Sequence, residues 1–458
     1  MRILLFSNIK GPEPYLPLNL LALATYAKAC GHQADIVDGQ VDAQWLDRCV
    51  ALAGQADAVG VSSYTGPSIN AVLVLLKELR KRGIRKPVVW GGYHGTLANR
   101  KIIGEGWADF VVQGYGEHAL IGILDHLAGK TDIGDIPNVS YRDENGKVKQ
   151  NRRTKIDFLD ELPPMDYSFV EVPKYYVPGR QTLQYISSYG CPYACTFCAE
   201  PAHSLRRWRG FSVERVVQDM KRLDDLYHPR MISFVDPNIS SQPARVAALA
   251  EALILAGSRV PILCNMRSRD VLEIEKIIPL DRLRAAGFRK IFIGIESGDD
   301  EQLKSLKKSA TASFHHQAVM ALDRAEIEVQ MSFIHDLPEE SDAQAKATLE
   351  LAENLLDVKT RGSYQSHHFY MPYPGTELFD TVFPEENSYD QVPTEDWART
   401  STFQANRVWQ GDPDRRRWVV GELEKFHTIN PAVVRKREIG RLRQSAAVGD
   451  DYLEHFLL

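Results

Sequence analysis

The stretch SSYGCPYACTFCAEP, residues 187–201, places Cys191, Cys195 and Cys198 within eight positions of one loop. The spacing C-x3-C-x2-C is tight enough to point three thiolates at one inorganic centre, but it provides no fourth cysteine. Soft thiolates are typical ligands of iron–sulfur clusters. A closed structural zinc site needs four protein ligands, so zinc would also require His203 or a distant residue. A cuboidal cluster held at three corners keeps one iron open for chelation by a substrate.

Around this loop, apolar runs alternate with helical patterns from Gln181 onward. The strand-like LQYISS leads into the cysteines, and five further strands with about five helices follow, the last strand being SHHFYMP. Repeated β–α units predict a full or partial parallel barrel whose functional residues lie at the C-terminal ends of the strands. We expect a partial (β/α)6 barrel over residues 181–385.

The chain before the barrel shows a second α/β pattern. Five β–α units are legible in the first 130 residues, and RILLFSN is the first of their strands. Such alternation predicts a doubly wound, Rossmann-like parallel sheet that binds ligands at the carboxyl ends of its strands. Two extended stretches around Asn145-Gly146 predict a hairpin that closes this domain. The expected division is a domain over residues 1–150, a proline-rich linker over 151–180 and a helical, basic C-terminal region over 386–458.

Composition narrows the class of protein. With 44% hydrophobic and 25% charged residues, the 458-residue chain has the make-up of a globular protein of two or three domains. A net charge of −5 and a pI near 6.3 disfavour nucleic acid as a partner. No apolar run approaches the roughly 18 to 20 residues that span a bilayer, and the N-terminus does not read as a signal peptide. We therefore expect a cytoplasmic protein without a membrane span.

CPYACTFC, with an aromatic residue before the last cysteine, resembles the cysteine motif of the radical S-adenosylmethionine (SAM) superfamily. The resemblance implies a [4Fe-4S] cluster held by Cys191, Cys195 and Cys198. It also implies that the amino and carboxylate groups of SAM chelate the open iron. One electron from the reduced cluster then cleaves SAM to a 5'-deoxyadenosyl radical, so an electron donor such as flavodoxin or ferredoxin is an expected partner.

Two further segments resemble the SAM contacts of that superfamily. IFIGIESG ends a predicted strand with Glu296 and Ser297, and the corresponding residues of the family hydrogen-bond the ribose and amino group of SAM. Arg267, which ends PILCNMR, is expected to form an ion pair with the SAM carboxylate through its planar guanidinium. Arg269 is the rival for that role.

Several barrel segments resemble the cobalamin-binding branch of the superfamily. They are WRGFSVERVV, FVDPNIS, FIHDLPEES and MPYPGTELFD, and they cover the barrel almost from end to end. Asp236, at a predicted strand tip in FVDPNIS, is the candidate catalytic residue facing the substrate. HDLPEES departs from the GLPGET-like string usual in the family.

The N-terminal domain resembles the cobalamin-binding domain that precedes radical SAM barrels, through ADAVGVSSYTG, PVVWGGYHGT and ADFVVQGYGE. Small side chains and bare backbone amides tolerate a bulky polar ligand, so the turns after the strands are the expected contacts. No D-x-H-x-x-G string is present, so cobalamin is expected without a lower histidine ligand, and His94 does not have the spacing for that role. A flavodoxin-like domain that has lost its cofactor is the alternative. The expected cofactor-binding residues are Ser62, Ser63, Thr65, Gly91, Gly92, His94, Gly114 and Glu117.

Together these resemblances imply a cobalamin-dependent radical SAM methyltransferase acting on an unactivated carbon of a small biosynthetic intermediate. A radical rearrangement, cyclisation or oxidation without methyl transfer remains open, as does a non-catalytic iron–sulfur or cobalamin-sensing protein. The adjacent pairs His315-His316 and His367-His368 suggest a metal site, yet neighbouring residues on a helix or strand point in different directions. A structural role or substrate contact is the better interpretation of these histidines.

Overall fold

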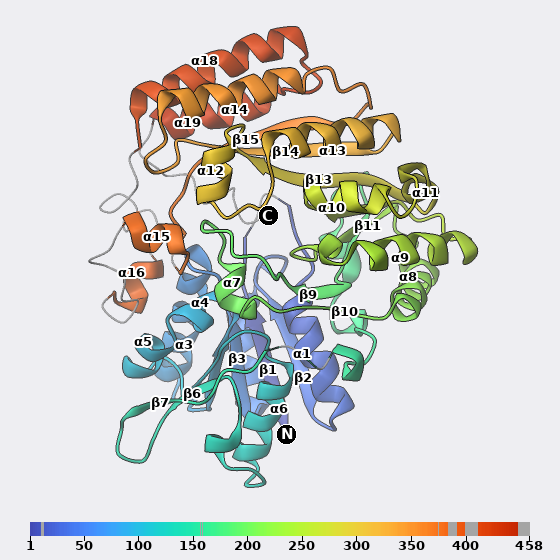
Figure 1. Cartoon of the computed structure of the whole chain (residues 1–458). Coiled ribbons are helices and arrows are strands. Elements are labelled where there is room, and N and C mark those ends of the chain that lie inside the picture. Colours follow the sequence, from blue (N-terminus) through green and yellow to red (C-terminus); the bar gives the residue numbers. More distant parts are fainter. Residues whose placement is uncertain are drawn as a thin grey trace.

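The computed structural model describes residues 1–10, 13–155, 157, 159–373, 375–382, 392–398 and 411–447. Two sheets lie one above the other, with the N-terminal one at the bottom of Figure 1. The expected α/β class is confirmed, with a doubly wound N-terminal sheet, a six-stranded parallel sheet and C-terminal helices. Of the predicted C-terminal region, residues 386–391, 399–410 and 448–458 lie outside the described residues. No helix within the described ranges is long and apolar enough to cross a membrane.

The N-terminal sheet is built around β1 (Arg2–Ser7), which is buried on both faces. Its side chains alternate, so Ile3 and Leu5 enter one core and Leu4 and Phe6 enter the other. Burying each such side chain contributes roughly 1.5–3 kcal/mol, and burial on both faces explains why the strand is a continuous apolar run. The strand order is β2-β1-β3-β4-β5-β6-β7, with β2 at Gln33–Asp38, β3 at Ala58–Ser62, β4 at Val88–Gly91, β5 at Phe110–Val112, β6 at Val139–Arg142 and β7 at Val148–Gln150.

Helices cover both faces of this sheet, and the antiparallel β6–β7 hairpin matches the one predicted around Asn145-Gly146. One core contains side chains of α1 (Leu18–Ala29) and α6 (Glu117–Leu127). The other core contains side chains of α2 (Trp45–Gln55), α3 (Pro67–Lys81) and α5 (Asn99–Gly104). The short α4 (Gly92–Leu97), which follows β4 directly, was not predicted.

The second sheet contains the six expected strands, all parallel, in the order β15-β14-β13-β12-β11-β8. Because all six are parallel, their C-terminal ends lie along one edge. The strands are β8 (Thr182–Tyr185), β11 (Met231–Phe234), β12 (Ile262–Asn265), β13 (Phe288–Glu296), β14 (Glu328–His335) and β15 (Tyr364–Phe369). The helices along this part of the chain are α8 (Val213–Tyr227), α9 (Pro243–Leu255), α10 (Ser268–Glu275), α11 (Leu280–Ala285), α12 (Asp300–Ser305), α13 (Ala312–Arg324) and α14 (Asp342–Asn354).

A small antiparallel ribbon, which the sequence did not predict, carries the cysteine loop. β9 (Ser188–Gly190) pairs with β10 (Trp208–Gly210), and α7 (Glu200–Ser204) lies between them in the chain. In Figure 1, α7 lies between the N-terminal sheet and the barrel. The ribbon therefore brings the cysteines to the junction of the two sheets.

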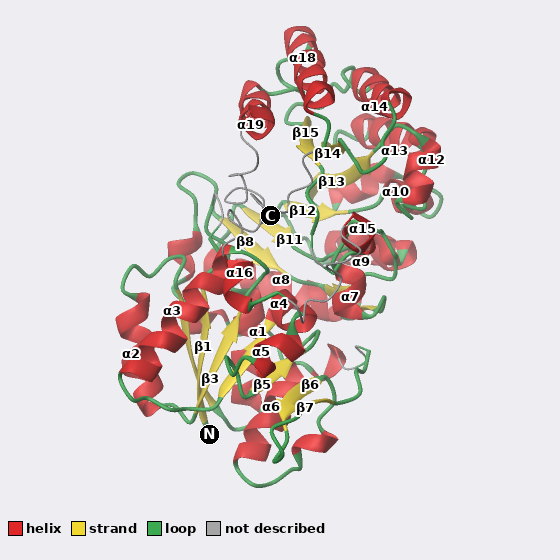
Figure 2. Cartoon of the chain, turned by 90° about the vertical axis from the view of Figure 1, so that its left-hand side faces the viewer, coloured by secondary structure: helices red, strands yellow, loops and turns green. Residues whose placement is uncertain are grey.

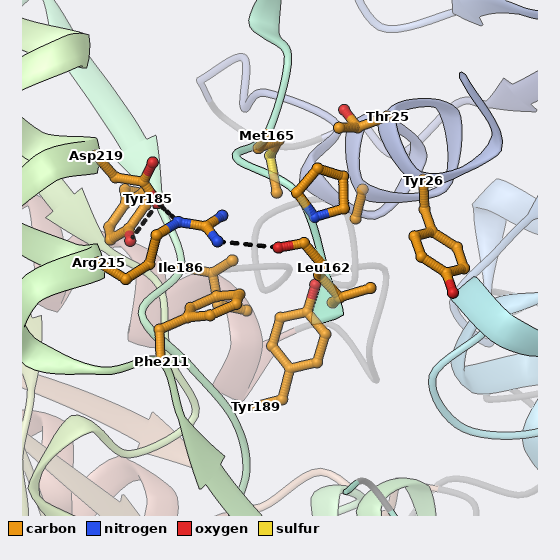
Figure 3. Close-up of a pocket in the computed structure, with 12 residues that line it drawn as sticks. Thr25, Tyr26, Leu162, Met165, Tyr185, Ile186, Tyr189, Phe211, Arg215 and Asp219 are labelled. Carbon is orange, nitrogen blue, oxygen red and sulfur yellow. Dashed lines mark hydrogen bonds and ion pairs between the residues drawn. The ribbon is translucent and has the colours of Figure 1, made fainter. Parts of the chain in front are cut away.

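The predicted linker packs across that junction. Tyr167 donates a hydrogen bond to the carbonyl of Gln184 at 2.8 Å, and Tyr175 donates one to Asp38 Oδ2 at 3.0 Å. Figure 3 shows a small pocket here, where Arg215 bonds the carbonyl of Leu162 at 2.9 Å. Tyr185 and Arg215 both donate to the Asp219 carboxylate, at 3.1 and 2.8 Å, so the pocket lies where the linker and the barrel are joined.

The C-terminal elements pack on both parts of the chain. In Figure 2, α18 (Pro413–Ile429) and α19 (Lys436–Ala447) lie beside β15, far from the N-terminus. α15 (Glu377–Val382) follows β15, and α16 (Thr394–Ala398) reaches back to α3, where Trp397 is buried in the N-terminal core. One apolar core runs through both sheets and holds them together.

Candidate active site

The cysteine loop is fixed from both sides by the barrel. The Thr196 amide donates to the carbonyl of Leu306 at 3.1 Å, and the Leu378 amide donates to the carbonyl of Thr196 at 2.8 Å. Cys191, Cys195 and Cys198 are half-buried, and none forms a disulfide. Three unpaired thiols are thus held on one anchored loop.

The donor set fits an iron–sulfur cube better than a zinc ion. Among the described residues, no three or more His, Cys, Asp or Glu side chains converge closely enough to hold one metal ion. A cube binds its thiolates at separate corners and accepts more widely spaced thiols. His203, which zinc would require, has its Nδ1 3.2 Å from Thr96 Oγ1 and its ring stacked on Tyr93. Burial raises the pKa of Cys191 to about 11 and that of Cys198 to about 12, so metal binding must remove these protons.

Arg267 presents a free donor beside the cysteine loop. Its guanidinium lies 3.4 Å from the centroid of the Tyr193 ring, which belongs to that loop. Its Nη2 is buried and has no hydrogen-bond partner, as expected of a donor reserved for an anionic ligand. Arg269 is exposed. The geometry thus favours Arg267 over its rival as the partner of a carboxylate.

Glu296 ends β13 beside the cysteine loop and forms a buried ion pair. Its Oε1 accepts from Lys308 Nζ at 2.7 Å, and the two side chains are only 8% and 10% exposed. Lys308 Nζ also lies 5.7 Å from the centroid of the Phe197 ring, between the last two cysteines. A Cβ at Gly294 would lie 2.2 Å from Glu296 Oε1 and 2.8 Å from Lys308 Nζ, so a side chain there would displace this ion pair. Lys308 was not predicted from the sequence.

Two predicted site residues use their side chains inside the protein. Ser297 is fully buried and donates to Gln302 Oε1 at 2.5 Å. Asp236 is also fully buried, and its Oδ1 accepts from Ser187 Oγ at 2.8 Å and from the Ser188 hydroxyl. Two serines of the segment that leads into the cysteine loop thus hold the Asp236 carboxylate. The catalytic role assigned to it remains a prediction.

Glycines line the ligand edge of the N-terminal sheet. Gly92 has a φ of +87°, and a Cβ there would lie 2.7 Å from the carbonyl oxygen of Ser63. Gly114 has a φ of +75° and lies against the carbonyl of His203. A Cβ at Gly91 would meet nothing within 4 Å. This edge of the sheet is therefore open beside Gly91, as the binding of a bulky ligand requires. The glycines of this edge fit a bound cobalamin.

The hydroxyls predicted to bind the cofactor are engaged in this structure. Ser62 Oγ accepts from Asn19 at 2.9 Å, and Ser63 Oγ accepts from the Trp90 indole at 3.0 Å. Thr65 Oγ1 lies 3.3 Å from Nδ1 of His94, a fully buried residue. These groups shape the turns beneath this edge of the sheet.

Glu117, also predicted to bind the cofactor, is bonded by the ribbon that carries the cysteine loop. It is 4% exposed and accepts from Tyr189 at 3.0 Å, next to the cysteine loop. Burial raises the pKa of its carboxyl group. Glu117 therefore links the two ligand edges.

Two known protein families match the chain, one in each of its two α/β parts. Residues 185–352 match the family model described as the radical SAM superfamily, and residues 7–124 match the B12 binding domain. The chain belongs to the radical SAM enzymes that carry a B12-binding domain. This family confirms the expected cofactors: a [4Fe-4S] cluster, SAM and cobalamin.

Named relatives of this radical SAM enzyme include methyltransferases and a cyclase. It is 28% identical over 370 residues to the uncharacterized methyltransferase PH0819 of Pyrococcus horikoshii, covering 80% of this chain and 78% of that protein. It is 24% identical to the anaerobic magnesium-protoporphyrin IX monomethyl ester cyclase of Synechocystis, covering 72% of this chain and 66% of the cyclase. The solved structure of the radical SAM methyltransferase TsrM from Kitasatospora setae has the same fold, with a TM-score of 0.72 and 19% identity, covering 84% of this chain and 76% of TsrM.

Buried histidines make this radical SAM enzyme sensitive to acid. Burial lowers the pKa of five of them to about 3, so they are neutral in the folded chain but bind protons below about pH 6.5 when unfolded. Their contribution to the free energy of unfolding is therefore fully present above that pH and decreases as the pH falls toward about 3. At about pH 5.5 the loss is roughly 1 kcal/mol per histidine. The five are His94, His203, His315, His335 and His368.

His315 gives the sharpest test of this acid sensitivity, because both its ring nitrogens lack partners while the adjacent His316 is exposed. We expect His315→Leu to reduce the loss of unfolding free energy between about pH 7.5 and about pH 5.5 by about 1 kcal/mol, and His316→Leu to leave it unchanged. Urea denaturation of the cofactor-free protein measures this. Equal losses in both variants and wild type would contradict the assignment.

Proposed function

We propose that this chain is a cobalamin-dependent radical SAM methyltransferase that alkylates an unactivated carbon of a small biosynthetic intermediate. When bound, the cluster and SAM supply a 5'-deoxyadenosyl radical, and cobalamin supplies a methyl group. The observation that carries the proposal is the direct contact of the two ligand edges. Tyr93, which follows β4 beside Gly92, donates to Glu200, and Glu200 lies two residues after Cys198. The edge that would carry the methyl group and the loop that would generate the radical therefore lie against each other.

The chain's own residues have separate roles in this proposal. Cys191, Cys195 and Cys198 hold the cluster, Arg267 pairs with the SAM carboxylate and Glu296 accepts from its amino group. Orientation by fixed partners favours attack at the intended atom, because it removes the entropy cost of aligning the reactants. Ser297 and Asp236 support strand ends, Gly91 leaves room for the corrin ring, and Gly92 and Gly114 allow the turns beside it to pack against neighbouring carbonyls. We also propose that the chain consists of an N-terminal domain over residues 1–150, a linker over 151–180, a barrel over 181–385 and a C-terminal region over 386–458. The extents of the two sheets support this division.

An acidic one-electron carrier such as flavodoxin or ferredoxin completes the proposal, in the cytoplasm. Beside the cluster loop, residues 151–155 and 157 lie along residues 202–209. Arg153 donates to the carbonyl of Ala202 at 2.9 Å, and Asp157 pairs with Arg207 at 2.9 Å. Across these two segments Asp157 is the single acidic residue, against six arginines and lysines. This basic strip supports docking of an acidic partner next to the cluster.

A single assay tests the proposal. The reconstituted protein is incubated anaerobically with cobalamin and methyl-labelled SAM, with dithionite or with reduced flavodoxin, and nucleoside products are measured. We expect both 5'-deoxyadenosine and S-adenosylhomocysteine. 5'-Deoxyadenosine without S-adenosylhomocysteine would contradict methyl transfer, and neither product from a filled cluster would identify a non-catalytic protein. Products with dithionite but none with flavodoxin would contradict that donor.

The similarity to a cyclase supports a second candidate function. The same radical could start a cyclisation or oxidation in which cobalamin carries no methyl group to the substrate. In the assay above, this candidate predicts SAM cleavage to 5'-deoxyadenosine with the labelled methyl group retained in methionine.

A further inference from the structure

One phenol oxygen of the N-terminal domain forms hydrogen bonds at both ends of the cysteine loop. Tyr115 Oη accepts from the amide of Gly190 at 2.9 Å and donates to Glu200 Oε1 at 3.0 Å. Gly190 immediately precedes Cys191, and Glu200 follows Cys198 by two residues. Both ends of the loop that would hold the cluster are thus tied to one atom of another domain.

This geometry explains why a tyrosine stands at position 115 and a glycine at position 190. A phenol can donate one hydrogen bond and accept another, so tyrosine serves both ends of the loop, whereas phenylalanine serves neither. Gly190 has a φ of +79°, and a Cβ there would lie 1.9 Å from the carbonyl oxygen of Arg207. The Tyr115 ring stacks on Tyr189 at 4.7 Å between centroids. The ring is therefore held in place independently of its hydroxyl.

The Glu200 carboxylate extends the contact to a second turn of the N-terminal sheet. It is 5% exposed, and its other oxygen accepts from the Tyr93 hydroxyl. Tyr93 lies on α4 after β4, whereas Tyr115 follows β5. A buried carboxylate is tolerated only when it is hydrogen-bonded, so losing either phenol is costly. Two turns of the proposed cobalamin edge thus bind the helix that leaves the cluster loop.

We propose that Tyr115 is a positioning residue that clasps the cluster loop and sets its distance from the cobalamin-binding edge. The inference rests on the proposed function, which requires a substrate radical to meet a methyl donor held by the other domain. A shift of about 1 Å in such an arrangement can lower the rate about a hundredfold. Holding both ends of the cysteine loop in place therefore protects the rate of the reaction. Tyr115 itself touches neither reacting atom in this scheme.

The test compares Tyr115→Phe with Tyr175→Phe by hydrogen–deuterium exchange of the full-length protein. Tyr175 is the control, because it also donates to a buried carboxylate, that of Asp38 at 3.0 Å, but lies away from the cysteine loop. We expect amides of residues 189–199 to exchange about tenfold faster in Tyr115→Phe and at the wild-type rate in Tyr175→Phe. Unchanged exchange in Tyr115→Phe, or equal acceleration in both variants, would overturn the proposal.

A second readout is the distance between the reduced cluster and cob(II)alamin in the reconstituted protein, measured by pulsed electron paramagnetic resonance. We expect a broader distribution in Tyr115→Phe than in Tyr175→Phe, and identical distributions would overturn the proposal. If Tyr115→Phe does not fold, Glu200→Gln replaces it, because an amide accepts through only one of its two terminal atoms. Neither readout needs turnover, so a wild type that cleaves no SAM would refute the proposed function while leaving the clasp to be judged separately.

Discussion

Cys195→Ala is expected to retain little iron and to form 5'-deoxyadenosine at less than about one hundredth of the wild-type rate. Changing an outer-shell partner of a metal ligand typically costs 10–100-fold, so losing one of three thiolates should cost more. No other cysteine can replace it, because Cys49 and Cys264 are buried elsewhere. Iron and sulfide content, the visible absorbance of the reconstituted protein and nucleoside analysis after dithionite reduction measure the effect.

Cys30→Ala is the matched control, because Cys30 is a free, exposed cysteine outside the loop. It should keep wild-type cluster content and SAM cleavage. A Cys195→Ala protein with full iron content and undiminished 5'-deoxyadenosine formation would refute the three-thiolate site. Cys191→Ala and Cys198→Ala should behave as Cys195→Ala does, because no position in a three-ligand cube is redundant.

The sequence predicted the parts of this molecule that depend on local pattern. The cysteine spacing is local, and so are the apolar runs that became β1 and β13. The hairpin at Asn145-Gly146 is local as well, since two residues determine the turn. Strand order within each sheet then follows from the preference for regular β–α connections.

Contacts at the site between residues far apart in the chain could not be predicted from the sequence. Lys308 meets Glu296 only because α12 returns the chain to the end of β13, and nothing distinguishes it from Lys307 in the string LKKS. Tyr115 lies 75 positions from Gly190, its hydrogen-bond partner. Ser297 and Asp236 were expected at the site because they end strands, and the buried hydrogen bonds that both side chains form there were not predicted.

Lys308→Met is expected to lower the free energy of unfolding by about 3–5 kcal/mol, because it leaves the Glu296 carboxylate buried without its cation. Lys307→Met is the matched control on the same loop. Lys307 pairs with Glu377 at 2.6 Å, but those side chains are 49% and 57% exposed. Solvent screens that pair, so its loss should cost below about 1 kcal/mol. Urea denaturation of the cofactor-free proteins compares the two.

The double variant Glu296→Gln/Lys308→Met separates the buried pair from simple loss of packing. If the cost of Lys308→Met comes from a stranded carboxylate, neutralising that carboxylate should restore much of the stability, and the two effects will be non-additive. Additive losses would show that the lysine stem, rather than its charge, stabilises the loop. The restored protein should still bind SAM weakly, because a neutral amide attracts the SAM ammonium less than a carboxylate does. Recovery of stability without recovery of SAM affinity, measured by equilibrium dialysis with the reconstituted cluster, would therefore assign Glu296 to the cofactor and Lys308 to holding it in place.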